Sequence, residues 1–235
     1  MNLFYIKDIA PGQKQVLLPA DEAFHCIKVL RLGHGDSIRL TDGTGHFYTA
    51  TLLNNDTRKL LARIEDFTRV SQTENCYIHL AVAPTKNMDR TEWFVEKATE
   101  IGVHKISLLE CQFSERRKLK EDRLQKVAVA ALKQSQRATL PQIEGLQTFN
   151  GFVQGLPSGG QRFMALVREN SRQLKDAAFA GQHYCVLVGP EGGFSDNEFE
   201  LASTAGFLPV SLGNYRLRTE TAATVACTIL NQLNF

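Results

Sequence analysis

The chain has 235 residues, of which 43% are hydrophobic and 22% are charged, with 17 Gly and 7 Pro. This composition is typical of a folded globular protein and excludes a disordered chain or a collagen-like repeat. No apolar run approaches the roughly 18 residues of a membrane span, and the N-terminus has no signal-peptide layout. The net charge of +2 is too small to indicate a polyanionic partner by itself.

The cysteines and histidines give no sign of a metal site. The five Cys are odd in number and far apart in the sequence, which together with the missing signal peptide favours reduced thiols in the cytoplasm. No CxxC or HExxH spacing is present, so we expect no metal. The chain also lacks the GxSxG, P-loop and GxGxxG motifs of hydrolases, kinases and dinucleotide-binding proteins.

Residues 1–70 predict a small β-barrel. A turn signal at 42–45 separates two β-rich runs, and one helix is expected over about 20–31, closed by Gly33. Five short strands and one helix suit a barrel of this size. The five strand candidates are LFYI near the start, VLL at 16–18, DSIRL at 36–40, HFYTATLL at 46–53 and KLLARIEDF at 59–67.

Residues 74–235 predict an α/β domain with a mostly parallel sheet, because strand and helix patterns alternate. The polar residues of Thr68–Glu74 separate the two domains. The strands are expected at 76–84, 105–110, 162–167, 184–189 and 208–212. The helices are expected at 89–101, 120–138, about 196–205 and about 220–232, and residues 157–160 are expected to form a surface loop.

Two glycine-containing loops follow predicted strands of this second domain. The first runs through Gly189-Pro190-Glu191-Gly192-Gly193, after which Ser195 and Glu198 predict a capping box for the next helix. Ligands bind at the carboxyl ends of strands in open α/β sheets, and glycines let the backbone approach a ligand closely. A tight turn without a ligand would explain this motif about equally well.

The second loop passes through Gly213 and begins a helix at about Thr219, with Arg216, Arg218 and Glu220 at the junction. Burying two arginines and a glutamate without partners would be costly. Surface arginines and a helix-capping threonine are the plain alternative for each residue alone. Two such loops about 25 residues apart favour a binding site.

The pair LVGPEGGFSDNE and SLG…LRTETA closely resembles the RsmE family, S-adenosylmethionine-dependent methyltransferases that modify N3 of a uridine in 16S ribosomal RNA. Residues 25–52 are similar to the family's PUA-like barrel, Lys86 with 96–103 to its first strand–helix unit, and 134–143 to its central basic element. The run Asn214-Tyr215-Arg216 departs from the Pro-Arg-Ile-like run expected there.

The resemblance implies a PUA-like RNA-binding barrel over 1–70 and a SPOUT methyltransferase domain with a deep trefoil knot over 74–235, an exception to the rule against knots. It also implies that backbone of the two loops cradles S-adenosylmethionine. Arg218 and Glu220 are then the candidate catalytic residues. The implied cofactor-binding residues are Val188, Gly189, Pro190, Glu191, Gly192, Gly193, Leu212, Gly213, Leu217 and Thr221.

A cationic excess over 115–137 supports an RNA partner, since eight Lys and Arg residues face three acidic ones. A solvated helix face is the alternative. The resemblance favours 16S rRNA, in the small ribosomal subunit or its precursor, as the partner. The candidate RNA-binding residues are Arg31, Arg116, Arg117, Lys118, Lys120 and Arg137.

Two other functions are compatible with these motifs: a different SPOUT enzyme that methylates tRNA or ribose, and a non-catalytic rRNA-binding assembly factor. The intact Gly189, Gly213 and Arg218-Thr219-Glu220 argue against the second. The resemblance further implies a homodimer, and the lack of a long apolar run predicts no membrane partner. The apolar positions Val225, Ile229 and Leu230 of the last helix support the dimer only loosely.

Overall fold

The computed structural model describes residues 2–70, 76–166 and 171–235, and the chain divides into two compact units. Unit 1 comprises Met1–Gln72 with Leu132–Leu140, and unit 2 comprises Thr73–Ala131 with Pro141–Phe235. The segment Leu132–Leu140 therefore belongs to unit 1, although the sequence assigns it to the second domain. Most of the expected linker at 68–74 and the end of the strand expected at 162–167 lie outside the described residues.

Unit 1 is built on a five-stranded sheet in the order β1-β3-β4-β5-β2. β1 and β3 are parallel, and the other neighbours are antiparallel. The five expected strands are confirmed, and the sheet is a half-barrel with β1 and β2 at its edges. Its elements are β1 (Leu3–Tyr5), β2 (Gln15–Leu17), α1 (Ala20–Phe24), the π-helical turn η1 (His25–Val29), β3 (Ser37–Thr41), β4 (His46–Leu52) and β5 (Leu61–Arg69).

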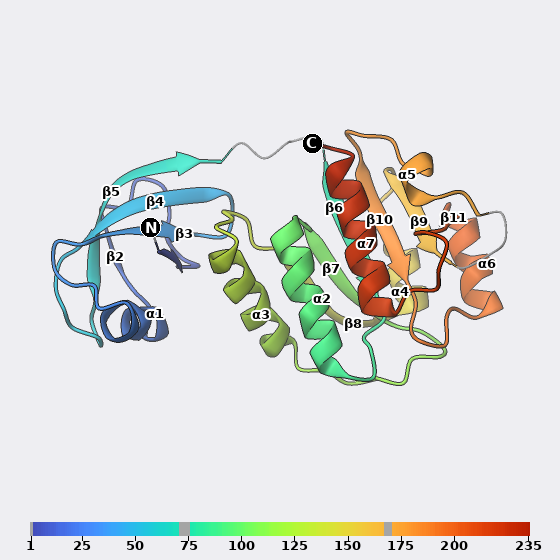
Figure 1. Cartoon of the computed structure of the whole chain (residues 1–235), viewed down its shortest axis with the longest axis horizontal. Coiled ribbons are helices and arrows are strands. Elements are labelled where there is room, and N and C mark those ends of the chain that lie inside the picture. The colour runs from blue at the N-terminus through green and yellow to red at the C-terminus, as the bar shows by residue number, and fades with distance from the viewer. Residues whose placement is uncertain (1, 71–75, 167–170) are drawn as a thin grey trace. The chain divides into compact units, whose positions relative to one another are not determined.

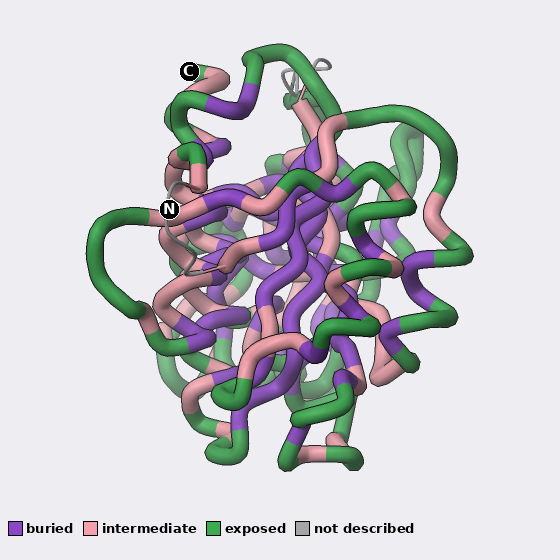
Figure 2. Tube along the Cα trace, turned by 90° about the vertical axis from the view of Figure 1, so that its right-hand side faces the viewer, coloured by how far each residue is buried: buried purple, intermediate pink, exposed green. Residues whose placement is uncertain are grey.

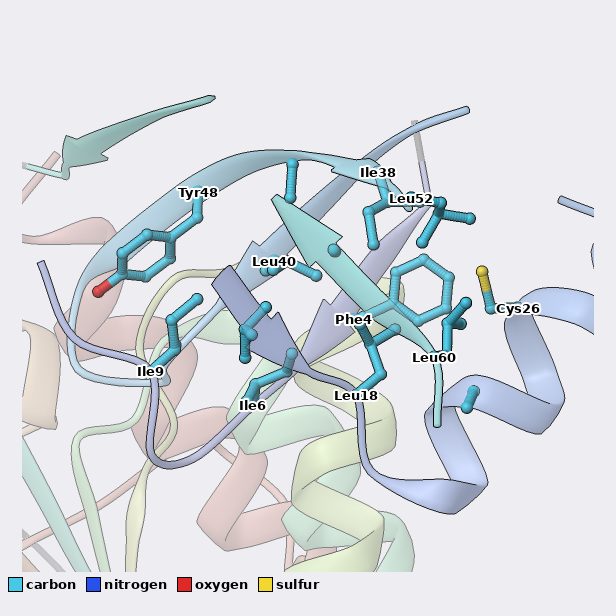
Figure 3. Close-up of a cluster of buried hydrophobic side chains, with 14 residues drawn as sticks. Phe4, Ile6, Ile9, Leu18, Cys26, Ile38, Leu40, Tyr48, Leu52 and Leu60 are labelled. Carbon is cyan, nitrogen blue, oxygen red and sulfur yellow. The ribbon is translucent and has the colours of Figure 1, made fainter. Parts of the chain in front are cut away.

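The core of unit 1 lies between the sheet and the α1–η1 segment (Figure 3). Alternate residues of a strand face the same side, so Tyr48, Ala50 and Leu52 of β4 all point into this core. Cys26 of η1 and Phe4 of β1 belong to the same core. Removing these apolar side chains from water is the main force that holds the half-barrel together.

The segment Leu132–Leu140 is hydrogen-bonded to the β3–β4 turn of the same unit. The Ala138 carbonyl accepts from Gly45 N at 3.0 Å and from Thr41 Oγ1 at 3.1 Å. Lys133 Nζ lies 2.7 Å from Oε1 of the buried Glu22. These contacts explain why the segment belongs to unit 1. They join residues about 90 or more positions apart, so the sequence pattern does not reveal them.

Unit 2 contains a six-stranded, all-parallel sheet in the order β11-β9-β10-β6-β7-β8 (Figure 1). Its strands are β6 (Tyr77–Val82), β7 (Lys105–Glu110), β8 (Gln142–Thr148), β9 (Gln161–Ala165), β10 (His183–Val188) and β11 (Leu208–Val210). Its helices are α2 (Met88–Ile101), α3 (Glu121–Gln134), α4 (Phe149–Gln154), α5 (Leu174–Ala177), α6 (Asp196–Thr204) and α7 (Thr219–Gln232), of which α3 ends in unit 1.

Helices cover both faces of this sheet, which is why β6 and β10 are almost continuously apolar. α7 packs against β6, β10 and α2, as Figure 1 shows, and α4 packs against α6 and the β7–β8 side. Buried stretches of backbone are flanked by exposed loops (Figure 2). No helix in the described part of the chain is long and apolar enough to cross a membrane.

The helix expected over 120–138 is too long. α3 begins at Glu121, where two acidic residues favour a helix N-terminus, whereas the cations at 116–120 would oppose the helix dipole. It ends at Gln134, and Gln136 has a left-handed φ of 57°. The residues 115–120 of the cationic stretch 115–137 therefore form a loop before α3 and not part of the helix.

Three elements of unit 2 are absent from the sequence-based expectations: β8, α4 and α5. β8 is an edge strand whose residues are half-exposed or exposed and largely polar, so it shows no apolar run. α4 and α5 have only six and four residues, too few for a helical period to stand out. The trefoil knot stays a prediction, since strand order alone does not define it.

Candidate functional site

A cavity of about 680 Å³ opens in unit 2 at the carboxyl ends of β9, β10 and β11. Ligands bind at this edge of open α/β sheets, and the volume lies in the range of small-molecule sites. Most of the residues that line it are glycine or apolar. It is formed by Ala165, Leu166, Val188, residues 189–194, Ser211, Leu212, Gly213, residues 215–219 and Ala222.

All the candidate cofactor-binding residues except Thr221 line this cavity. Thr219 and Ala222 are three positions apart and share the helix face that lines it, whereas Thr221 lies on another face of α7. The sequence did not identify Ala165 or Leu166. Finding them requires the strand order, which sets β9 beside β10.

The loop after β10 is shaped by close packing. An added Cβ at Gly189 would lie 3.0 Å from the Phe194 ring, and one at Gly192 would lie 2.9 Å from Cβ of Phe113. The loop ends in the predicted capping box, because Ser195 and Glu198 bond reciprocally at the start of α6. Larger residues at the two glycines would therefore force the loop outward.

The buried Glu198 also connects this loop to the loop after β7. One carboxylate oxygen accepts from Ser195 N at 2.8 Å, and the other accepts from Gln112 N at 2.8 Å. Glu198 therefore joins the loop after β10 to the loop after β7. The loop after β7 includes the basic residues 115–120 and is called the basic loop below. The sequence indicated only the capping role of Glu198.

The loop after β11 is anchored on the loop after β10. Ser211 Oγ donates to the Gly213 carbonyl at 2.7 Å. Arg216 Nη2 donates to the Glu191 carbonyl at 3.2 Å, and Thr219 Oγ1 donates to the Gly189 carbonyl at 2.9 Å. Two loops 25 residues apart thus form one continuous wall, and Thr219 serves as a bridge between them, while the N-cap position is Arg218.

Lys86 connects the loop after β6 to the same wall. Its backbone N–H donates to Glu191 Oε1 at 3.1 Å, and its Nζ lies 2.8 Å from Glu115 Oε2. The hydrogen bond and charge of Glu115 raise the pKa of Lys86. Lys86 therefore bonds the loop after β10 through its backbone N–H and the basic loop through its ammonium group.

The two candidate catalytic residues are not brought together in the described structure. Arg218 is exposed and lines the cavity, and the described residues provide no acidic partner for it. Glu220 is buried, does not line the cavity, and has Oε1 3.7 Å from Nε of Arg90 on α2. Its other oxygen, Oε2, has no hydrogen-bond partner among the described residues.

The candidate RNA-binding residues fall in both units. In unit 1, Arg31 is exposed with a left-handed φ of 57°, and Arg137 follows the end of α3. In unit 2, Arg116 donates to the carbonyls of residues 85 and 86, so much of its donor capacity is used inside the fold. Arg117 pairs with Glu110 at 3.0 Å.

Lys118 and Lys120 are the exposed cations of this loop without an ion pair among the described residues. They are the best placed of the loop's cations to meet an external phosphate. No group of three or more His, Cys, Asp or Glu side chains in the described part of the chain could hold a metal ion.

Comparison with protein families matches residues 72–231 to an RNA methyltransferase domain and residues 18–65 to an RNA methyltransferase PUA domain. The ribosomal RNA small subunit methyltransferase E of Rickettsia conorii is 30% identical over 96% of this chain and 93% of its own length.

Solved structures are similar over the whole chain. A probable rRNA methyltransferase from Porphyromonas gingivalis is 40% identical with a TM-score of 0.91, covering 100% of this chain and 98% of the other. The ribosomal RNA small subunit methyltransferase E of Neisseria gonorrhoeae, bound to S-adenosylmethionine, is 28% identical with a TM-score of 0.90 and the same coverage.

Proposed function

Because the chain belongs to the RsmE family of S-adenosylmethionine-dependent RNA methyltransferases, we propose that it methylates N3 of one uridine in 16S rRNA of the small ribosomal subunit. We propose that it meets this RNA in the small ribosomal subunit or its precursor, and that it acts in the cytoplasm. The observation that carries the proposal is the cavity at the carboxyl edge of the unit 2 sheet.

The residues of this cavity fit S-adenosylmethionine. The lining includes four glycines, and a Cβ added at Gly213 would meet no protein atom within 4 Å, which leaves open space beside the loop. Apolar side chains such as Val188 and Leu217 suit the uncharged parts of the cofactor. We propose that residues 188–193, Leu212, Gly213 and Leu217 hold it.

When bound, S-adenosylmethionine supplies an activated methyl group for transfer. The protein must align the base with this group and favour the deprotonated base, because a uridine N3 has an available lone pair only after its proton has left. Arg218 stays protonated and cannot be the base. We assign it the stabilisation of negative charge on the uridine, assisted by the N-terminal turn of α7, which lines the cavity.

Glu220 is better suited to position α7 than to accept the proton. Its carboxylate is buried beside Arg90 and does not line the cavity. An acidic side chain in the first turn of a helix also interacts favourably with the helix dipole. Glu220 therefore orients Arg218 indirectly, by holding the first turn of α7, whose N-cap residue is Arg218.

We further propose a homodimer with two-fold symmetry. On α7, Leu230 is fully buried within its own unit, so it is a core residue. Val225 and Ile229 are half-buried and are the positions of this helix that can contribute to a contact between copies. Light scattering at working concentration should give twice the mass of the chain, and a fully active monomer would refute the dimer.

The experiment that tests the function is mass spectrometry of nucleosides from small-subunit rRNA of a strain that lacks the gene. We expect 3-methyluridine to be lost, and to return when the wild-type chain is supplied but not when Arg218→Ala is supplied. Heat released on titration with S-adenosylmethionine would exclude a non-catalytic assembly factor, which should give none. Unchanged 3-methyluridine in the deletion strain would refute the proposed substrate.

A further inference from the structure

Tyr215 is a solvent-exposed aromatic residue at the cofactor cavity. It lines the cavity, yet it is 85% exposed. At this exposure it belongs to no hydrophobic core, and it makes no hydrogen bond or ring contact with the residues that the structure describes. Folding therefore gives no reason for an aromatic residue at this position.

The loop that carries Tyr215 makes a hydrogen bond within itself before this residue and a hydrogen bond to the loop after β10 beyond it. Ser211 Oγ bonds the Gly213 carbonyl on one side, and Arg216 Nη2 bonds the Glu191 carbonyl on the other. Because Arg216, the next residue, is bonded to the loop after β10, the ring of Tyr215 is kept at the cavity rim.

The charges around Tyr215 suit a nucleic acid. Arg216 and Arg218 lie on the same loop, and both are exposed and line the cavity. Aromatic rings flanked by cations are a common way to bind unstacked RNA bases, since the ring stacks on the base and the cations meet phosphate or carbonyl oxygens. Enzymes that modify a base must take it out of its stack, and a protein ring then replaces the lost stacking.

We propose that Tyr215 is the stacking platform for the target nucleobase of the RNA. This inference rests on the proposed function, because it names the residue that holds the base beside the cofactor. It assigns Tyr215 to RNA and not to the cofactor, and it gives a role to the Asn214-Tyr215-Arg216 run in which this chain departs from the family pattern.

The first test compares Tyr215→Ala, Tyr215→Leu and Tyr215→Phe with the wild type on small-subunit rRNA transcribed in vitro. Loss of the ring in Ala or Leu should raise the KM for RNA by roughly tenfold to a hundredfold, the scale of one lost base–aromatic stack. Tyr215→Phe should stay close to the wild type. The affinity for S-adenosylmethionine, measured by calorimetry, should be the same in all four proteins.

Phe179→Ala is the matched control. Phe179 is 67% exposed in the same unit, but it precedes β10 and therefore lies at the amino-terminal edge of the sheet, and it does not line the cavity. Its loss should leave the KM for RNA unchanged.

The second test does not depend on methyl transfer. In a Trp93→Phe background, which removes the single tryptophan, Tyr215→Trp provides a fluorescent ring at the rim. Addition of the RNA transcript should quench it through stacking, whereas Phe179→Trp in the same background should not respond. An inactive wild-type enzyme would count against the proposed function, while the quenching result still decides the role of Tyr215.

Four results would overturn the inference. Weaker binding of S-adenosylmethionine to Tyr215→Ala would make the ring part of the cofactor wall. A normal KM in Tyr215→Leu would show that any apolar cover is sufficient. A changed particle mass would assign Tyr215 to a contact between copies. Absence of quenching at position 215 would exclude stacking on RNA.

Discussion

His79 should make unit 2 less stable at mildly acidic pH. Its ring is buried in β6, and Nε2 lies 2.8 Å from Ser107 Oγ on β7. The Ser107 hydroxyl donates a hydrogen bond to Glu144 Oε2 on β8 at 2.7 Å, so Ser107 Oγ accepts one from His79 Nε2. Burial foremost, with a contribution from Lys105, lowers the pKa of His79 from 6.5 to about 4.

The sign follows from proton uptake. Between pH 4 and pH 6.5 the unfolded chain binds a proton at this histidine and the folded chain does not, so stability is lost as the pH falls through this window. With these two pKa values, the loss between pH 7.5 and pH 5 is about 2 kcal/mol. The pKa of Glu144 is also lowered, but its stabilising effect is lost mainly below its ordinary value of 4.5.

Urea unfolding measures this loss when it is followed by the fluorescence of Trp93, which lies on α2 in the same unit. His79→Gln retains an amide donor toward Ser107 but does not titrate. Its free energy of unfolding should therefore fall by about 2 kcal/mol less than that of the wild type between pH 7.5 and pH 5. His34→Gln, at an exposed position, is the control and should match the wild type. Equal losses in wild type and His79→Gln would refute the reasoning.

Three further predictions concern the proposed reaction. Arg218→Ala should lower kcat by about 10²-fold, the scale of one lost preorganised charge stabiliser, with partial recovery at higher pH where solvent supplies uridinate; a loss confined to RNA affinity would make it a phosphate ligand. Gly213→Val should weaken S-adenosylmethionine binding in calorimetry, whereas Gly206→Val, also at a positive φ with open space but away from the cavity, should not; equal affinities would refute the cofactor placement. Lys118→Glu with Lys120→Glu should weaken RNA binding and flatten its salt dependence while leaving cofactor affinity unchanged, and an unchanged salt slope would remove the basic loop from the interface.

The sequence predicts the features that depend on local chemistry. A strand followed by Gly189-Pro190-Glu191-Gly192-Gly193 and a capping box at Ser195 identifies a strand-end loop, because glycine, proline and capping residues act over a few positions. The alternation of strand and helix patterns predicts the parallel sheet, because a helix between two strands allows them to run in the same direction. The C-terminal end of α3 was predicted wrongly, since the residues after Gln134 are fixed by contacts with residues about 90 positions earlier.

The rest of the site depends on which strands are neighbours. Leu166 enters the cavity only because β9 lies between β10 and β11.

Arg116 has the appearance of a phosphate ligand in the sequence, yet its guanidinium bonds carbonyls about 30 residues earlier. Glu220 has the appearance of a catalytic residue in the sequence, yet its carboxylate pairs with Arg90 on α2. A charged residue in a basic or catalytic motif therefore has two competing uses, inside the fold and toward a ligand. Arg218 and Lys118 point to the second use because they are exposed and the described residues leave them without an acidic partner. The proposed roles differ accordingly: Arg116 and Glu220 position the loops and α7, and Arg218 and Lys118 meet the RNA.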